Sequence, residues 1–284
     1  ILDSLISYEY FSDVSDIENT TFNNFNNALE DRDFKLFQDS LSSYNMTYLT
    51  LGSVLEMDYY DKELTYNNRD NFFPKSLYKK EPPELLKNLN NIGYEFIYSG
   101  NFWAQCKNSI NFSCGNRIID YDSLSFSKRL FQYTNNAGIQ TFTSRSILGY
   151  ILKKLESYFG SLFYDDGLTN FMESSIDFIE PNSKKFYFIH NESPHPPYPE
   201  NNCEIDHTKS YVGWVSMEAY SFSISCALNT TLSSINKILE IDPSAIIVVQ
   251  GDHGVSLNYD WMDNPLMINK EDLKERFSIY NSIR

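Results

Sequence analysis

Two of the four histidines follow closely on apolar runs that predict buried strands. His190 comes directly after the run 185–189, and Asp252-His253 comes shortly after the run 245–249. Asp3 follows the apolar pair Ile1-Leu2, which is typical of the end of a strand. Because ligands bind outside the carboxyl ends of the strands in open α/β sheets, we expect these polar side chains to meet in one site.

The turn Gly251-Asp252-His253-Gly254 sets a carboxylate beside an imidazole. Glycine has no Cβ, and we expect the two glycines to let the backbone turn sharply and aim both side chains inward. Together with Asp3 and one hydroxyl oxygen, the pair forms a set of three oxygens and one nitrogen. Zn²⁺ binds such a set tetrahedrally, and Mn²⁺ suits sites in which oxygen dominates. The alternative is a histidine packed at a sheet end, with Asp252 as a helix cap.

Apolar periodicity predicts the elements that must position these residues. We expect helices at 21–30, 45–57, 84–91, 147–159 and 212–240, and strands at 35–37, 94–98, 185–189, 245–249 and 277–284. The run 245–249 is apolar at every position, which is typical of a strand buried on both faces of a parallel sheet. The alternation of strands and helices predicts one α/β domain over 1–284, a three-layer α/β/α sandwich with a mostly parallel central sheet. We expect an irregular insertion at 101–145.

The helix predicted at 45–57 follows a loop and brings a hydroxyl to the same edge of the sheet. Its apolar face comprises Tyr48, Leu51, Val54 and Leu55. Thr47 lies in its first turn. The alternative reading of Thr47 is a residue that caps the helix, a common role for threonine.

The formal net charge of −15 excludes several classes of function. A chain this acidic is a poor candidate for binding nucleic acid, where phosphates require lysine and arginine. The same charge disfavours passive adhesion to anionic lipid. No stretch approaches the roughly 20 apolar residues of a membrane span.

Four cysteines are consistent with two disulfides and an oxidising compartment. We expect local pairs, Cys106 with Cys114 and Cys203 with Cys226. The alternative is four reduced thiols. No pair has the spacing of a zinc finger.

Four polar segments follow one another in a fixed order along the chain. They are Ile1-Leu2-Asp3, the stretch from Asn45 to Leu51 with Thr47 and Thr50, the stretch from His190 to Tyr198 with His195, and the turn 251–254. This series resembles the motifs of the alkaline phosphatase/sulfatase superfamily. It is most similar to the sulfatase-like, membrane-anchored bacterial phosphotransferases, such as lipid A phosphoethanolamine transferases and lipoteichoic acid synthases.

The resemblance implies a role for each segment. Its metal ligands would be Asp3, Thr47, Asp252 and His253, which would hold one divalent ion, Zn²⁺ or Mn²⁺. Thr47 would be the nucleophile that forms a phospho-threonine. The residues expected to contact the transferred group are Asn45, His190 and His195. The alternatives are a strand-end residue bonded to backbone for His190, a rigid-loop surface residue for His195, and a turn residue for Asp3.

The resemblance also implies a reaction. A phosphoethanolamine- or phosphoglycerol-like group would move from a phospholipid or other phosphorylated donor to a glycan or lipid of the cell envelope. The abrupt ends of the sequence suggest a piece of a longer protein, with a membrane anchor outside it and an extracytoplasmic location. Two Asn-x-Ser/Thr sequons, at Asn45 and Asn191, lie inside the expected site, so a bacterial origin fits better than a eukaryotic secretory one.

Departures from the superfamily pattern narrow the chemistry. The segment Thr47-Tyr48-Leu49-Thr50-Leu51 lacks the Cys/Ser-x-Pro-x-Arg context of sulfatases, which favours phosphate esters over sulfate esters. No histidine follows His253, so we expect a single metal ion. Two alternatives stay open: a hydrolase that uses water as the acceptor, and a non-catalytic surface-binding module with the same fold.

Overall fold

The computed structural model describes residues 1–14, 20–60, 82–99, 112–114, 179, 181, 183–196, 198–199, 203, 216–256 and 269–284. The described helices are α1 (Tyr8–Val14), α2 (Thr20–Glu30), α3 (Thr47–Glu56), α5 (Glu84–Asn91), α10 (Met217–Ile241) and α12 (Lys270–Phe277). The described strands are β1 (Lys35–Leu36), β2 (Glu95–Ser99), β3 (Phe112–Cys114), β4 (Lys185–Ile189), β5 (Val248–Gln250) and β6 (Asn281–Ile283). No helix in these ranges is both long enough and apolar enough to cross a membrane.

The predicted helices and strands are largely confirmed where the structure describes them, but two strands are shorter than expected: the run 245–249 gives only β5 at Val248–Gln250, and the stretch 277–284 gives only β6 at Asn281–Ile283. The helix predicted at 84–91 and the strand predicted at 185–189 have the expected bounds. The helix predicted at 147–159 lies outside the described residues. So does most of the insertion predicted at 101–145, apart from β3, which pairs with β2.

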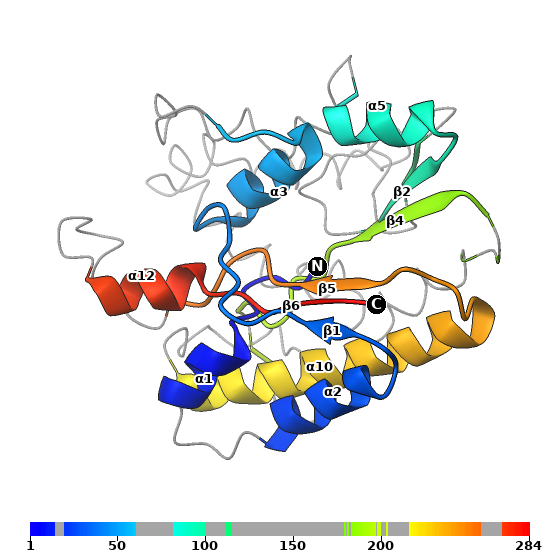
Figure 1. Ribbon diagram of the computed structural model, residues 1–284. Helices are drawn as coiled ribbons and strands as arrows, with labels where there is room; N and C mark the ends of the chain where they lie inside the picture. Colours follow the sequence, from blue (N-terminus) through cyan, green and yellow to red (C-terminus); the bar gives the residue numbers. More distant parts are fainter. Residues whose placement is uncertain are drawn as a thin grey trace, which may run out of the picture.

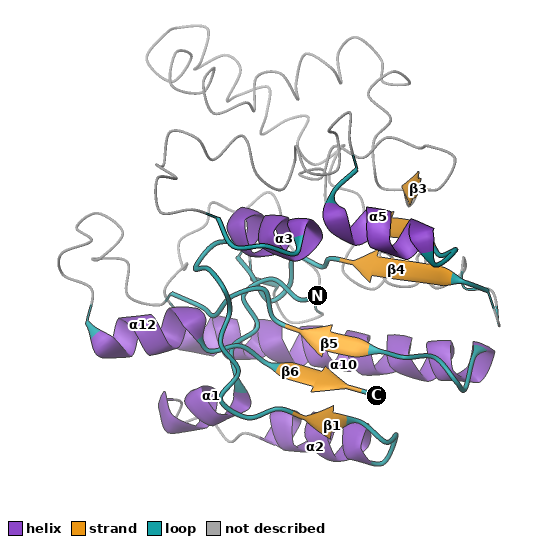
Figure 2. Ribbon diagram, turned by 45° about the horizontal axis from the view of Figure 1, so that its top comes forward, coloured by secondary structure: helices purple, strands orange, loops and turns teal. Residues whose placement is uncertain are grey.

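The strands form two sheets that the backbone of residues 1–3 joins. One sheet has the order β3-β2-β4 and is parallel, and the other has the order β1-β6-β5 and is antiparallel. Leu2 forms parallel bridges to Asn191, just after β4, and to Gly251, just after β5. The carboxyl ends of β4 and β5 therefore meet beside Asp3 (Figures 1 and 2).

A mostly parallel central sheet is not what the structure shows. β6 enters between β1 and β5 and pairs with both of them antiparallel. The α/β class is confirmed, since helices pack against both sheets. In Figure 1, α3 and α5 lie beside β2 and β4, while α1, α2 and α10 lie along the β1-β6-β5 sheet.

Two apolar clusters hold these layers together. One cluster joins α2 and α10 to the β1-β6-β5 sheet through Phe22, Leu29, Ile224, Leu228 and Val249. The other joins α3 and α5 to β2 and β4 through Leu51, Leu55, Leu86, Phe96 and Phe188. The site lies at the carboxyl ends of β4 and β5.

Two burial predictions were wrong. Val54 of α3 is exposed, whereas Leu51 and Leu55 lie in the second cluster and Tyr48 packs against it. The apolar run 245–249 is not buried on both faces. Val249 is 5% exposed, but Ile246 and Val248 are 81% and 50% exposed, because one face of this run packs on the core and the other does not.

Candidate active site

The structure brings together all four residues expected to hold a metal ion. Asp3 ends the segment between the sheets, Thr47 is the first residue of α3, and Asp252 and His253 follow β5. Thr47 Oγ1 lies 3.0 Å from His253 Nε2 and 3.3 Å from Asp3 Oδ2. All four side chains are buried. Segments more than 200 residues apart in sequence thus converge on one small polar cluster.

The two glycines of the turn serve close packing. A Cβ on Gly251 would collide with the backbone oxygen of Leu5, and a Cβ on Gly254 would collide with that of Glu275. Neither glycine adopts the left-handed backbone that only glycine tolerates well. Our explanation by a sharp turn was therefore wrong, because the glycines are needed for room and not for an unusual φ.

The His253 ring faces the cluster with its unprotonated nitrogen, Nε2. Its Nδ1 lies 2.8 Å from Gly254 O, and a carbonyl oxygen can only accept, so Nδ1 carries the proton. Nε2 therefore holds a lone pair. It lies 3.5 Å from Asp3 Oδ1 and 3.6 Å from Asp252 Oδ2, which are also acceptors. Three acceptors facing one another in a buried site repel unless a cation lies among them or one carboxylate takes up a proton.

Asp252 shows the same need for a cation. Its Oδ1 accepts the backbone N–H groups of Ser4 at 2.9 Å and His253 at 2.7 Å. Its Oδ2 is buried and accepts no hydrogen bond within the described part of the chain. A buried carboxylate oxygen without a donor needs a cation or a water molecule as its partner.

The spacing of these atoms fits one zinc ion. Four ligands at about 2.0–2.2 Å from a tetrahedral zinc lie roughly 3.3–3.6 Å from one another. The distances that link Thr47 Oγ1, His253 Nε2 and the two carboxylates run from 3.0 to 3.6 Å. The residues present therefore suit a divalent ion, which the sequence predicts to be Zn²⁺ or Mn²⁺.

His190 lies closer to the carboxylates than expected. Its Nε2 is 4.0 Å from Asp252 Oδ2. One nitrogen of His190 and one oxygen each from Asp3 and Asp252 lie within 4.8 Å of one another, so this trio could also hold a metal ion. The sequence predicts that His190 contacts the transferred group, and the structure adds that it faces the same two carboxylates.

Burial sets the charge states of these groups. It lowers the pKa of His190 to about 4 and holds the pKa of His253 well below its usual value. Both imidazoles are therefore neutral near pH 7 and can offer lone pairs. Burial, followed by the charge of Asp252, raises the pKa of Asp3 well above its usual value. A divalent cation would reverse that shift by favouring the carboxylate.

The amino-terminus of α3 is open toward the cluster. Met46 is the N-cap residue, and its side chain makes no capping hydrogen bond, so the capping role considered for Thr47 is wrong. Uncapped N–H groups and the helix dipole make such a terminus a ready site for a phosphate. Thr50 is excluded from the cluster, since its hydroxyl donates to Tyr44 O.

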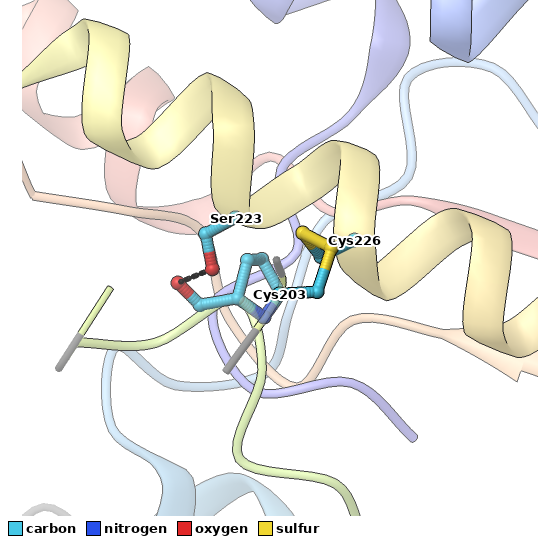
Figure 3. The surroundings of a disulfide bond; sticks show 4 residues. Cys203, Ser223 and Cys226 are labelled. Atoms are coloured by element: carbon cyan, nitrogen blue, oxygen red, sulfur yellow. Dashed lines mark hydrogen bonds between the residues drawn. A yellow bond between two sulfur atoms is a disulfide. The ribbon is translucent and has the colours of Figure 1, made fainter. Parts of the chain in front are cut away.

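His195 lies in the loop after β4, which is fastened to α10. Ser223 Oγ donates to Pro194 O, and Cys203 forms a disulfide with Cys226 (Figure 3). The predicted pairing of these two cysteines is confirmed, whereas Cys106 lies outside the described residues. Burial is the main cause that lowers the pKa of His195, and the charge of Asp252 acts on it in the opposite direction. His195 is therefore within electrostatic reach of the cluster.

Sequence reasoning missed Arg276. This residue of α12 donates from Nε to Asn45 O at 2.7 Å and from Nη1 to Gly254 O at 2.9 Å. It therefore ties the loop before Thr47 to the turn that carries His253. Asn45 itself is half-buried and enters the site through its carbonyl. No sequence signal singles out Arg276, because it lies in a short, highly charged segment.

Comparison with solved structures identifies the fold of this chain. No family model matches the chain, and no curated protein matches it by sequence. The crystal structure of the C-terminal periplasmic domain of EcEptC from Escherichia coli matches with a TM-score of 0.52 and 16% identity. The match covers 100% of this chain and 70% of that one.

The chain has the fold of this periplasmic domain. A second structure of the domain, in complex with Zn, matches with a TM-score of 0.51, 16% identity and the same coverage. The periplasmic domain of phosphoethanolamine transferase EptC from Campylobacter jejuni gives 0.46 at 10% identity, over 100% of this chain and 77% of that one. The resemblance inferred from the motifs is thus confirmed at the level of the fold.

Proposed function

We propose that this chain is the metal-dependent catalytic domain of a phosphotransferase that works through a phosphorylated Thr47. One observation carries the proposal. The Thr47 hydroxyl, at the open end of a helix, lies 3.0 Å from the bare Nε2 of His253 and 3.3 Å from Asp3. A reactive hydroxyl, a cation site and an anion-binding helix end coincide at one atom.

The residues of the site divide the first half-reaction among them. Asp3, Thr47, Asp252 and His253 would hold a divalent ion, which lowers the pKa of a hydroxyl that it touches and offsets charge on the transferred group. Thr47 Oγ1 forms a bond to phosphorus while the bond to the leaving oxygen breaks. The proton that Thr47 gives up passes to that oxygen, which leaves as an alcohol. The N–H groups at the start of α3 bind the phosphoryl oxygens.

His195 suits the second half-reaction. Its Nδ1 lies 2.6 Å from Pro196 O, so this nitrogen carries the proton and Nε2 is an acceptor. A neutral imidazole can take the proton of an incoming alcohol as that alcohol attacks phosphorus. The bond between phosphorus and Thr47 Oγ1 then breaks, and the proton returns to Thr47.

The group transferred would be phosphoethanolamine- or phosphoglycerol-like, moved from a phospholipid to a glycan or lipid of the bacterial cell envelope. Two observations support this setting. The structures that share the fold are periplasmic domains of a bacterial protein. The disulfide between Cys203 and Cys226 is of a kind that persists in oxidising compartments.

Mass spectrometry of the intermediate tests the proposal. The zinc-loaded protein is mixed with vesicles of phosphatidylethanolamine or phosphatidylglycerol, quenched in acid and digested. We expect the mass of the transferred group on Thr47, no such adduct in Thr47→Ala, and the adduct retained in Thr50→Ala. Thr50 is the matched control, a buried threonine of the same helix whose hydroxyl bonds to Tyr44 O.

The products separate the remaining alternatives. Release of the free phosphorylated headgroup, with no acceptor present, would identify a hydrolase. An adduct on Thr50 in place of Thr47, or none with any donor although zinc binds, would contradict the phospho-threonine mechanism. Absence of both zinc binding and adduct would favour the non-catalytic binding module.

A further inference from the structure

Ser4 has a backbone conformation that serine rarely adopts. Its φ is +62°, in the left-handed region, and its side chain is only 2% exposed. This region brings Cβ too close to the backbone for residues other than glycine, with some tolerance for asparagine and aspartate. Residues held in such conformations persist only where the surroundings over-determine them, and they gather at functional sites.

The left-handed turn gives Ser4 contacts with three residues of the metal cluster. Its backbone N–H donates to Asp252 Oδ1 at 2.9 Å. Its hydroxyl donates to Asp3 Oδ1 at 3.1 Å and lies 3.3 Å from His253 Nδ1.

Each contact fixes the direction in which a ligand faces. The N–H of Ser4 holds Asp252 Oδ1, which leaves Oδ2 facing His253 Nε2 at 3.6 Å. The hydroxyl can accept from the protonated Nδ1 of His253 while it donates to Asp3. This link keeps the bare Nε2 of His253 turned toward the cluster. Groups that orient metal ligands in this way typically change metal affinity when they are removed.

The strained turn is itself held from two directions. The hydroxyl of Tyr220, on α10, donates to Ser4 O at 2.7 Å and accepts from Ile6 N. The backbone N–H of Tyr280 donates to Leu5 O at 3.2 Å. Leu5 and Ile6 are buried in the core. The fold thus forces Ser4 into its unfavourable conformation, and the benefit appears at the metal cluster.

We propose that Ser4 is a positioning residue that aligns Asp3, Asp252 and His253 to receive the metal ion. This inference rests on the metal site of the proposed function. It assigns to Ser4 no contact with substrate and no role in the transfer itself.

Two substitutions separate the hydroxyl from the backbone strain. Ser4→Ala removes the hydroxyl and keeps the strain, whereas Ser4→Gly removes the hydroxyl and relieves the strain. We expect both variants to bind Zn²⁺ about 10–100-fold more weakly than the wild type, measured by competition with a chelator. We also expect metal-free Ser4→Gly to melt at a higher temperature than metal-free Ser4→Ala. Stability and metal affinity would then not change together.

Ser7 provides the matched control. It is a buried serine three residues farther along, and its hydroxyl accepts from Tyr10 N at the start of α1. Ser7→Ala should lower the melting temperature and leave zinc affinity within twofold of the wild type. If Ser7→Ala weakens zinc binding as much as Ser4→Ala, the effect is general destabilisation and the inference fails.

The outcomes also distinguish this inference from the proposed function. A wild-type protein that does not bind Zn²⁺ would overturn the metal site, and both proposals with it. A wild type that binds Zn²⁺ while Ser4→Ala and Ser4→Gly bind it equally well would overturn the role of Ser4 alone.

Discussion

Asp252→Asn is the substitution for which the structure makes the sharpest prediction. The two backbone N–H groups of Ser4 and His253 both donate to Oδ1 of Asp252. In the variant this position must hold the amide oxygen, because an amide NH₂ cannot accept. The NH₂ group then takes the place of Oδ2, which lies 3.6 Å from the bare Nε2 of His253. A hydrogen-bond donor would stand where the wild type has a third acceptor.

This exchange should stabilise the metal-free protein. Leaving a buried polar group unsatisfied costs about 1–3 kcal/mol, and the amide removes that cost together with the repulsion between Asp252 and Asp3. Unfolding entropy for 284 residues is about 0.6 kcal/mol per kelvin. The melting temperature of metal-free Asp252→Asn should therefore lie about 2–5 °C above that of the metal-free wild type.

With zinc bound, the wild type should have a higher melting temperature than Asp252→Asn. Free ion at 1,000 times the dissociation constant stabilises a folded protein by about 4.1 kcal/mol. For this chain that corresponds to a rise of about 7 °C in the melting temperature of the wild type. Asp252→Asn has lost an anionic ligand and should show less than a quarter of the rise.

Thermal unfolding by circular dichroism, with EDTA and with excess Zn²⁺, measures all four melting temperatures. Asp272→Asn is the control, since Asp272 is another buried aspartate that accepts from Asn269 N in the capping box of α12. It should lower the melting temperature in both buffers and keep the full zinc shift. A metal-free Asp252→Asn that melts below the wild type, or one that keeps the zinc shift, would refute the reading of Oδ2 as a metal ligand.

Two further predictions concern residues that hold the site. Arg276→Ala should slow the formation of phospho-Thr47 about 100-fold, because a shift of about 1 Å between catalytic groups has that cost. The single-turnover rate of Arg276→Lys should be closer to that of Arg276→Ala than to that of the wild type, because the two bonds come from separate nitrogens of a planar guanidinium, a geometry that one ammonium group does not reproduce. Cys226→Ser opens a disulfide across 23 residues and should cost about 3 kcal/mol of stability. Its zinc affinity should be unchanged, and a loss of zinc binding would mean that the loop also shapes the metal cluster.

The elements were predictable where the signal is local. The helix α10 and the bounds of α5 and β4 follow from periodicity and from breaks within a few residues. The direction of β6 was not predictable in this way. Its partners are Lys35–Leu36 and Val248–Gln250, and pairing over such separations depends on which faces the rest of the chain buries. The exposure of Ile246 and Val248 was not predictable for the same reason, because it depends on which face of the run the rest of the chain covers.

The residues of the candidate site were also only partly predictable from the sequence. Asp252-His253 and Asp3 could be singled out because a polar residue after an apolar run is visible in the sequence. The contacts of Ser4 and Arg276 could not, because they depend on a left-handed turn and on a helix from the other end of the chain. Serine and arginine are ordinary residues in those segments until the fold brings them to the cluster.

The two possible metal sets can be weighed by their spacing. Both contain Asp3 and Asp252, and they differ in whether His253 with Thr47 or His190 completes the set. His253 Nε2 lies 3.5 and 3.6 Å from the carboxylates, within the roughly 3.3–3.6 Å expected for ligands of one tetrahedral zinc. His190 Nε2, at 4.0 Å from Asp252 Oδ2, lies beyond that range. An ion held by the first set would also touch the Thr47 hydroxyl. That set therefore accounts both for the spacing of the acceptors and for the position of Thr47 Oγ1, and the contact of His190 with the transferred group stays a prediction.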